Sequence, residues 1–457
     1  MHRKICIFNV YQINNPIDIQ NVSVLKAKII GLKIKFMPQD FSTEWTTLQR
    51  IIFRFIFCYF ILFLVFFTGQ AFPIWMIRFL DFINEFLQNI YNASIGWIAS
   101  IFLKQEIRQF RNGGDNLFNN VAVVTFLTLS LIGTIVWSAI SKNKSHEKLS
   151  RIFFTALRYY LAILMFDYGL AKVFGIQFRY PAPGDLLKPL GDHIPYTLLW
   201  RFMGYSKLYC IITGSVEILG GVLLLFRKTT MLGAVLTFGA LCNVFILNVS
   251  YGIDVKLFSL NLLIIAVVLM TPNLKNIYDF IILHKSSFIP VMQPAFDWQK
   301  RRFFPKILKI FFLCYLGYNA LSRPIKFLPQ LAAMKSAFYG AYQVEDFILN
   351  GISLPPLTTD TIRWKKMIVD NKWGVLVQYM SDSTKWYSGT IDTVSKSVEL
   401  KDPEDTSFKS KFFYVSTQPQ KYMFKEIWRN DSIVVNLQKM DLNQFRLVKS
   451  KRPWIVH

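Results

Sequence analysis

Four ionisable side chains lie inside two segments that are otherwise apolar enough to cross a membrane. The first segment, LRYYLAILMFDYGLAKVF, carries Arg158, Asp167 and Lys172, and the second, ITGSVEILGGVLLLF, carries Glu217. Charged groups are costly inside a bilayer, and those that occur there commonly belong to a functional site with a charged or polar partner. We therefore expect the activity of this protein to lie between these two segments.

Glu217 is the deepest of these charges. It lies about ten residues from either end of its segment, which at about 1.5 Å per residue places it near the middle of a bilayer. Gly214 and Gly221 lie on the same helical face, and small residues let a neighbouring helix approach closely. Glu217 therefore faces protein, and we predict that it pairs with Arg158 as the catalytic group. A purely structural or protonated Glu217 is the alternative.

A second group of polar residues is predicted to bind a ligand around this pair. Lys172 falls on the same helical face as Arg158 and near the outer surface, whereas Asp167 points roughly the other way. The predicted binding residues are Asp167, Tyr168, Lys172, Asn243, Asp254 and Lys256. Structural roles are the alternatives: Arg158 and Lys172 could extend to the two membrane surfaces, Asn243 could bond a neighbouring helix, and Asp254 and Lys256 could cap a helix.

The composition favours a membrane protein and argues against several other classes. Of 457 residues, 53% are hydrophobic, and the net charge of +24 comes from basic residues in short loops between apolar runs. Such loops fit a membrane protein better than a nucleic-acid surface. The five cysteines form no CxxC pair, the five histidines lie outside the apolar runs, and no zinc spacing occurs. We therefore predict no nucleic-acid partner and no metal or haem site; no cofactor is evident from these residues, and the bilayer is the expected partner.

Seven apolar stretches have about the length that a bilayer requires. A loop rich in aromatic residues between the first two, which contains Trp75 and Trp97, is predicted to form one or two amphipathic helices at the membrane surface. A re-entrant piece at 90–103 is the alternative. The predicted spans are residues 51–69, 121–140, 152–174, 206–226, 229–249, 255–271 and 306–321.

The loop charges predict the orientation and the organisation of the chain. Lys and Arg are concentrated in alternate loops, which favours a cytoplasmic N-terminus and an extracytoplasmic C-terminus. The predicted divisions are a lead-in at 1–50, two spans with an outer loop at 51–140, a four-helix core at 152–272, a basic cytoplasmic linker at 273–305, a seventh span at 306–321 and an outer β domain at 335–457.

The last 120 or so residues have the pattern of an all-β domain. Apolar and polar residues alternate in eight or nine short runs separated by turn signals. This pattern predicts a closed antiparallel barrel or a sandwich. The first run, GAYQVEDFILNG, weakly resembles the first strand of lipocalin-like barrels, which either hold a small ligand or fill their interior with side chains.

The helical core resembles the DoxX family of membrane proteins. The resemblance covers about 152–272 and is carried by an arginine, a GxxK pair and an ExxGG run in consecutive spans, at Arg158, Gly169, Lys172, Glu217, Gly220, Gly221 and Arg227. It implies a bacterial cytoplasmic-membrane protein linked to a thiosulfate:quinone oxidoreductase subunit, with a quinone and a partner redox subunit as expected partners. The extra spans and the β domain depart from the short family pattern. A non-catalytic scaffold or small-molecule carrier, whose outer β domain binds a ligand or an envelope protein, is the alternative function.

Overall fold

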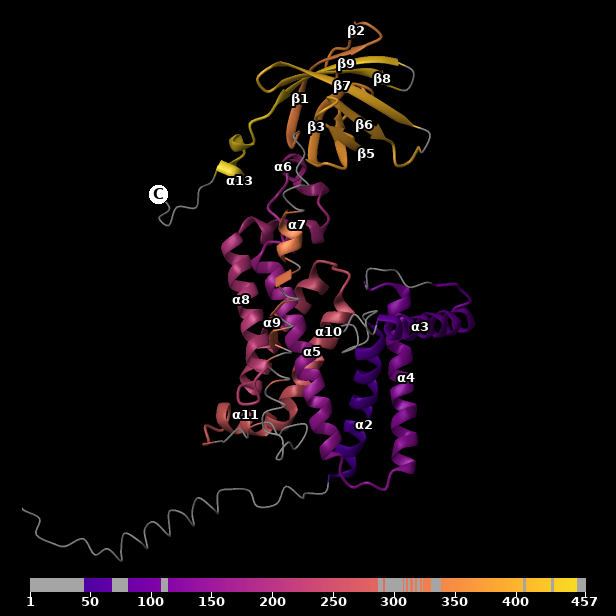
Figure 1. The fold of residues 1–457 in the computed structure, drawn as a ribbon, viewed down its shortest axis with the longest axis vertical. Coiled ribbons are helices and arrows are strands. Elements are labelled where there is room, and N and C mark those ends of the chain that lie inside the picture. The colour runs from indigo at the N-terminus through magenta and orange to yellow at the C-terminus, as the bar shows by residue number, and fades with distance from the viewer. Residues whose placement is uncertain are drawn as a thin grey trace, which may run out of the picture.

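The protein consists of a bundle of long helices with a β-barrel at one end (Figure 1). The computed structural model describes residues 45–67, 81–107, 114–286, 338–405, 408–428 and 431–449, with single residues and short pieces between 291 and 329. In these ranges six helices are long and apolar enough to cross a membrane. The predicted combination of a multi-span helical protein with an antiparallel β domain is confirmed.

Six of the seven predicted spans correspond to these helices. They are α2 (Thr47–Leu62) with the π-helical turn η1 (Phe63–Phe67), α4 (Leu117–Ile140), α5 (Glu147–Val173), α8 (Lys207–Leu224), α9 (Thr230–Ser250) and α10 (Lys256–Met270), the last continuing through η5 (Thr271–Asn273) into α11 (Leu274–Ile281). The predicted seventh span at 306–321 falls where the structure describes only scattered residues. The lead-in before residue 45 and most of the predicted linker also lie outside the described residues.

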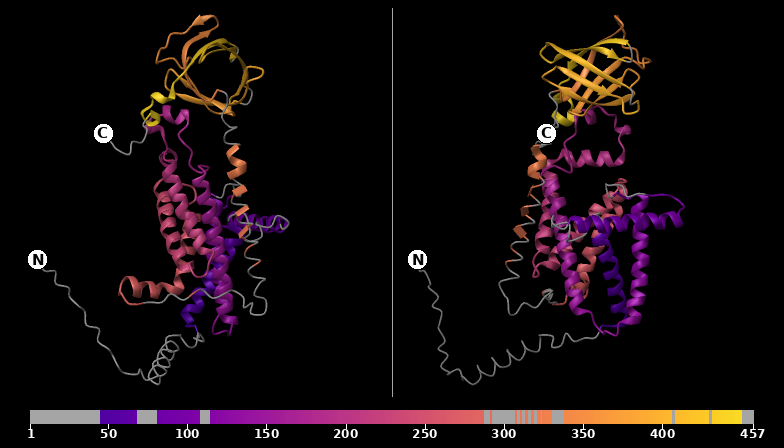
Figure 2. Two further views of the ribbon diagram at one scale, coloured as in Figure 1. Left: turned by 60° about the vertical axis from the view of Figure 1, so that its left-hand side comes forward. Right: turned by 45° about the vertical axis from the view of Figure 1, so that its right-hand side comes forward.

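Helix α3 (Asp81–Phe102) runs across the direction of the spans (Figures 1 and 2). One face packs Tyr91 against Phe118 and Phe126, while Phe86 and Trp97 on the other side are exposed. This is the amphipathic helix that the outer loop predicts, and it is continuous through 90–102. Trp75 lies outside the described residues.

Helices α5, α8, α9 and α10 pack around one another as a four-helix bundle. The closest approach is between α5 and α8, where a Cβ atom on Gly214 would lie 2.5 Å from the carbonyl oxygen of Gly169. A Cβ atom on Gly169 would lie 2.7 Å from the carbonyl oxygen of Gly214. The two backbones are therefore in direct contact, which only glycine permits at these two positions.

The C-terminal domain is a closed barrel and not a sandwich. Strand β1 pairs with both β3 and β9, so eight antiparallel strands form a ring, while the short β2 adds a hairpin to β1. Figure 2 shows the ring from its end. The strands are β1 (Gly340–Leu349), β2 (Ile352–Ser353), β3 (Trp364–Asn371), β4 (Gly374–Tyr379), β5 (Thr384–Asp392), β6 (Ser397–Lys401), β7 (Lys409–Gln418), β8 (Lys421–Trp428) and β9 (Asp431–Lys439).

Aromatic side chains pack across the interior of this barrel. The ring of Trp364 lies 5.3 Å from that of Trp428 and 5.9 Å from that of Phe412, and Tyr387 lies 5.1 Å from Trp428. All four side chains are buried. Such packing is typical of small barrels whose interior is filled by side chains.

The barrel is docked on the connection between α5 and α8. The short helix α6 (Pro183–Leu187) contacts β3, and the Gly184 N–H donates a 2.9 Å hydrogen bond to Asp370 Oδ1. A Cβ atom on Gly184 would lie 2.6 Å from Asp370 Oδ2. Burial raises the pKa of the Asp370 carboxyl, and the nearby Asp185 adds to the rise, while the Gly184 hydrogen bond opposes it. Asp370 therefore joins the barrel to the end of the helical bundle.

Replacing Gly214 with alanine is expected to lower the unfolding temperature of the purified protein in detergent. The added methyl group must push α5 and α8 apart, and overpacking of this kind costs about 1–3 kcal/mol. Gly239→Ala on α9 is the matched control, because a Cβ atom added there would meet no atom within 4 Å. That control should be neutral or stabilising by up to about 1 kcal/mol, through helix propensity alone. Equal unfolding temperatures for the two variants would contradict the glycine contact.

The docking of the barrel is expected to weaken as the pH rises. Because burial raises the pKa of Asp370 above its usual 3.8, its contribution to stability is complete below that value and is lost as the pH rises through the raised pKa. Asp370→Asn keeps an acceptor for the Gly184 N–H but cannot ionise. Unfolding midpoints of both proteins, measured between about pH 3 and pH 8, should show the wild type losing stability relative to the variant. A constant difference over this range would exclude titration of Asp370.

Candidate functional site

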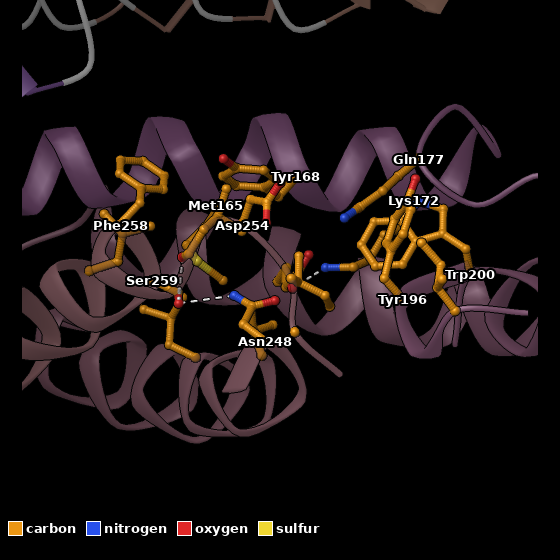
Figure 3. Close-up of a pocket in the computed structure, with 18 residues that line it drawn as sticks. Met165, Tyr168, Lys172, Gln177, Tyr196, Trp200, Asn248, Asp254, Phe258 and Ser259 are labelled. Carbon is orange, nitrogen blue, oxygen red and sulfur yellow. Dashed lines mark hydrogen bonds and ion pairs between the residues drawn. The ribbon is translucent and has the colours of Figure 1, made fainter. Parts of the chain in front are cut away.

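A cavity of about 590 Å³ lies inside the four-helix bundle. Its walls come from all four helices, and the connection between α5 and α8, which includes α7 (Pro195–Tyr205), covers one end. Tyr196 and Trp200 of α7 border this end, with their rings 4.8 Å apart (Figure 3). The volume is within the range of cavities that bind small molecules.

A buried ion pair forms the polar centre of the cavity. Lys172 of α5 donates from Nζ to Glu217 Oε1 of α8, and the two residues are only 6% and 4% exposed. The glycine contact explains why they meet. A Cβ atom on Gly214, one turn before Glu217, would lie 3.0 Å from Lys172 Cβ. Lys172 therefore does not extend to the membrane surface, and its ammonium group is neutralised inside the bundle.

The predicted pairing of Arg158 with Glu217 is wrong. Helices α5 and α8 are antiparallel, with Gly169 beside Gly214 and Ala162 beside Gly221. This register places Glu217 level with residue 166, whereas Arg158 lies eight residues, or about 12 Å, farther along the helix.

Arg158 is nevertheless buried, at 3% exposed. Its Nη1 donates to Thr230 Oγ1 at 3.2 Å, at the start of α9, and its guanidinium lies 5.0 Å from the ring centre of Tyr159. Arg158 is not among the residues that line the cavity. Its position fits a role in joining α5 to α9.

The cavity includes some of the predicted binding residues and leaves out others. Tyr168 and Asp254 line its outer part, and both are exposed. Asp167, which is half-buried, and Asn243, which is exposed on α9, are not lining residues. Lys256 is not a lining residue either. Its Nζ lies 3.3 Å from Asp115 Oδ2, and the Asp115 carboxylate caps α10 by accepting from the backbone N–H groups of Lys256 and Leu257.

Several lining residues were not predicted from the sequence. Asn248 on α9 donates through Nδ2 to Ser259 Oγ on α10 at 2.9 Å, and both side chains are buried. Gln177 and the two aromatic residues of α7 complete the covered end. A polar residue within each of two consecutive spans is the sequence signal for Asn248 and Ser259. By contrast, Asn261 accepts a hydrogen bond from Tyr59 and joins α10 to α2.

The arrangement suits exchange of a proton with a small neutral molecule. An ammonium and a carboxylate held together away from water can pass a proton to or from a bound group without a lasting change in net charge. Aromatic rings and apolar side chains form the rest of the wall. In the described part of the chain, no three His, Cys, Asp or Glu side chains lie close enough together to hold a metal ion.

Comparisons with known proteins give one informative similarity. The chain is 36% identical over 113 residues to the uncharacterised protein YwoB of Bacillus subtilis (strain 168). The matched region is 25% of this chain and 71% of YwoB. No family model and no solved structure matches the chain.

The ion pair is expected to contribute to stability only as a pair. Lys172→Met or Glu217→Met alone leaves one buried charge without its partner, which costs about 3–5 kcal/mol. The double variant should recover most of this loss, because replacing both members of a buried pair by apolar groups is often neutral. Unfolding of the four proteins in detergent measures the coupling.

A control for this cycle is Lys256→Met, because the Lys256–Asp115 pair is partly exposed. Partly exposed pairs contribute about 0–1 kcal/mol, so this variant should lose much less stability. Strictly additive losses in the Lys172 and Glu217 variants would show that the two side chains do not interact.

Proposed function

We propose that this chain, which belongs to the same family as the uncharacterised protein YwoB of Bacillus subtilis, is an integral protein of the bacterial cytoplasmic membrane. We propose further that it binds a quinone and exchanges protons with it. The observation that carries the proposal is the buried Lys172–Glu217 pair in a cavity of about 590 Å³ between membrane-spanning helices. The resemblance of the core to the DoxX family, through Lys172, Glu217 and the adjacent glycines, supports the same proposal.

The lining of the cavity fits a flat ring with polar oxygens. The rings of Tyr196, Trp200 and Phe258 supply apolar faces on which another ring can pack. An ammonium group has three donors, so Lys172 can hold Glu217 with one and a ligand oxygen with another. Apolar side chains such as Met165 and Leu262 form the remaining wall. The donor set and the volume therefore fit a quinone ring.

The residues of the chain supply protons and positioning. A bound quinone supplies two-electron chemistry coupled to two protons. The Glu217 carboxylate can take up a proton from the ligand and return it, and the Lys172 ammonium balances the charge of the unprotonated form. Trp200 and Tyr196 restrict the entry of water at the covered end. The electrons come from a partner redox subunit or directly from the substrate.

The orientation that we propose places the N-terminus in the cytoplasm and the barrel outside it. The concentration of Lys and Arg in alternate loops supports this orientation. Helix α7, which carries Trp200 at the covered end of the cavity, lies on the same side as the barrel (Figure 1). A ligand would then reach the cavity from the outer half of the membrane.

A second candidate function is a non-catalytic scaffold whose barrel contacts an envelope partner. Phe413, Val415 and Ile427 are exposed on the outer surface of strands β7 and β8, beside Lys425, which pairs with Phe413 in the strand register. Exposed apolar side chains grouped in this way are typical of contact surfaces. In this case the barrel variants, and not the cavity variants, would abolish function.

Filling the cavity is expected to abolish quinone binding. Val244 of α9 lines the cavity, whereas Val249 of the same helix does not and is exposed. Val244→Trp should weaken duroquinone binding about five- to hundredfold, since this corresponds to a steric conflict of about 1–3 kcal/mol. Val249→Trp should bind like the wild type. Equilibrium dialysis of the purified full-length protein in lipid nanodiscs gives both Kd values.

Matched unfolding temperatures of the two tryptophan variants serve as the folding control. Duroquinone binding that is equal in both variants, or absent from the wild type, would overturn the proposed quinone site. The scaffold is favoured if replacing Phe413 and Ile427 by serine abolishes the function of the protein while duroquinone binding stays unchanged.

A further inference from the structure

We propose that the cavity prefers the reduced, hydroxyl-bearing form of its ligand, a quinol or a similar phenol, over the quinone. This inference rests on the proposed function and concerns the binding step alone. It follows from the hydrogen-bond acceptors that remain unused at the covered end of the cavity. The preference decides which redox form occupies the site when both are present in the membrane.

Glu217 has one carboxylate oxygen in use and one free for a ligand. Oε1 accepts from Lys172, whereas Oε2 is buried and has no hydrogen-bond donor among the described residues. A buried acceptor without a donor costs about 1–3 kcal/mol, and more when it is charged. The terminal torsion of a glutamate side chain is soft, so the carboxylate can turn Oε2 toward a ligand while Lys172 stays attached. Glu217 Oε2 can therefore accept a hydrogen bond from a ligand that donates.

Gln177 provides a second acceptor at the same end of the cavity. It lines the cavity beside Lys172 (Figure 3), and its Oε1 is also buried without a donor among the residues that the structure describes. Lys172 Nζ bonds Glu217 and keeps two further N–H donors, which the oxygens of either redox form can accept. The covered end of the cavity therefore offers two free acceptors that only a donating ligand can satisfy.

These two free acceptors distinguish the two redox forms of a quinone. The carbonyl oxygens of a quinone only accept hydrogen bonds, so they cannot satisfy Glu217 Oε2. A quinol carries two hydroxyl groups, each of which can donate to a carboxylate or amide oxygen. A hydrogen bond to a charged group contributes about 1.5–3 kcal/mol, which corresponds to a factor of about ten to a hundred in affinity.

Three probes of nearly the same shape test the preference in the full-length protein in lipid nanodiscs. They are duroquinone, duroquinol kept reduced under anaerobic conditions, and the dimethyl ether of duroquinol, which keeps the ring and the oxygens but cannot donate. Isothermal titration calorimetry should give a Kd for duroquinol at least about tenfold lower than for either of the others. Equal or tighter binding of duroquinone, or equal binding of the ether, overturns the inference.

Variants connect the preference to the buried pair. The charge-balanced double variant Lys172→Met with Glu217→Met removes the acceptor without leaving a lone charge, and it should bind the three probes within about threefold of one another. Lys256→Met, outside the cavity, should keep the wild-type order. An unchanged quinol preference in the double variant also overturns the inference.

The two proposals fail in different ways. If the wild type binds none of the three probes, or if Val244→Trp binds as the wild type does, the quinone site itself is overturned and the preference with it. If all three bind the wild type equally and Val244→Trp blocks them all, the site stands and only the preference for the reduced form is overturned.

Discussion

The contact between the backbones of Gly169 and Gly214 is the constraint on which the rest of the membrane part depends. Neither position tolerates a side chain without moving a helix, since a Cβ atom added at either would lie within 2.7 Å of the opposite carbonyl oxygen. The contact determines both the distance between α5 and α8 and their register. One turn beyond it, Lys172 meets Glu217, and the two buried charges neutralise each other. Without the glycines, the ion pair would have neither the distance nor the register that it needs.

The same region connects the cavity to the barrel. Gly184 of α6 binds Asp370 of the barrel, while Asp185 of α6 pairs with Arg201 of α7 at 2.8 Å. Arg201 directly follows Trp200, which covers the cavity. A continuous series of polar contacts therefore runs from β3 to the covered end of the cavity. Aromatic rings pack across the interior of the barrel, and Asp370 attaches the barrel to the helical bundle.

The chemistry that we propose follows from one buried pair and one unused oxygen. Lys172 and Glu217 are opposite charges in an apolar cavity, and such groups respond strongly to any ligand that donates, accepts or carries charge. A membrane-soluble ring with polar oxygens matches both the apolar walls and the polar centre. Arg158, which the sequence made equally prominent, bonds Thr230 outside this cavity and fits a structural role.

The architecture could be predicted from the sequence because local patterns determine it. The length and hydropathy of the apolar runs predicted the six spans that the structure describes, and period-two alternation predicted the β domain, since bilayer thickness and strand geometry act on each segment separately. The orientation of Glu217 toward protein was also predictable, because Gly214 and Gly221 share its helical face. The residue that pairs with Glu217 could not be predicted from the sequence. Arg158 and Lys172 lie on one face of α5, so periodicity cannot choose between them; only the register of α5 against α8 does. That register, like the closure of the barrel through β1 and β9 and the convergence of Asn248, Ser259 and Trp200 on one cavity, depends on contacts between segments far apart in the chain. The tertiary structure alone decides such contacts, because the free energy of packing two surfaces is a property of both surfaces together.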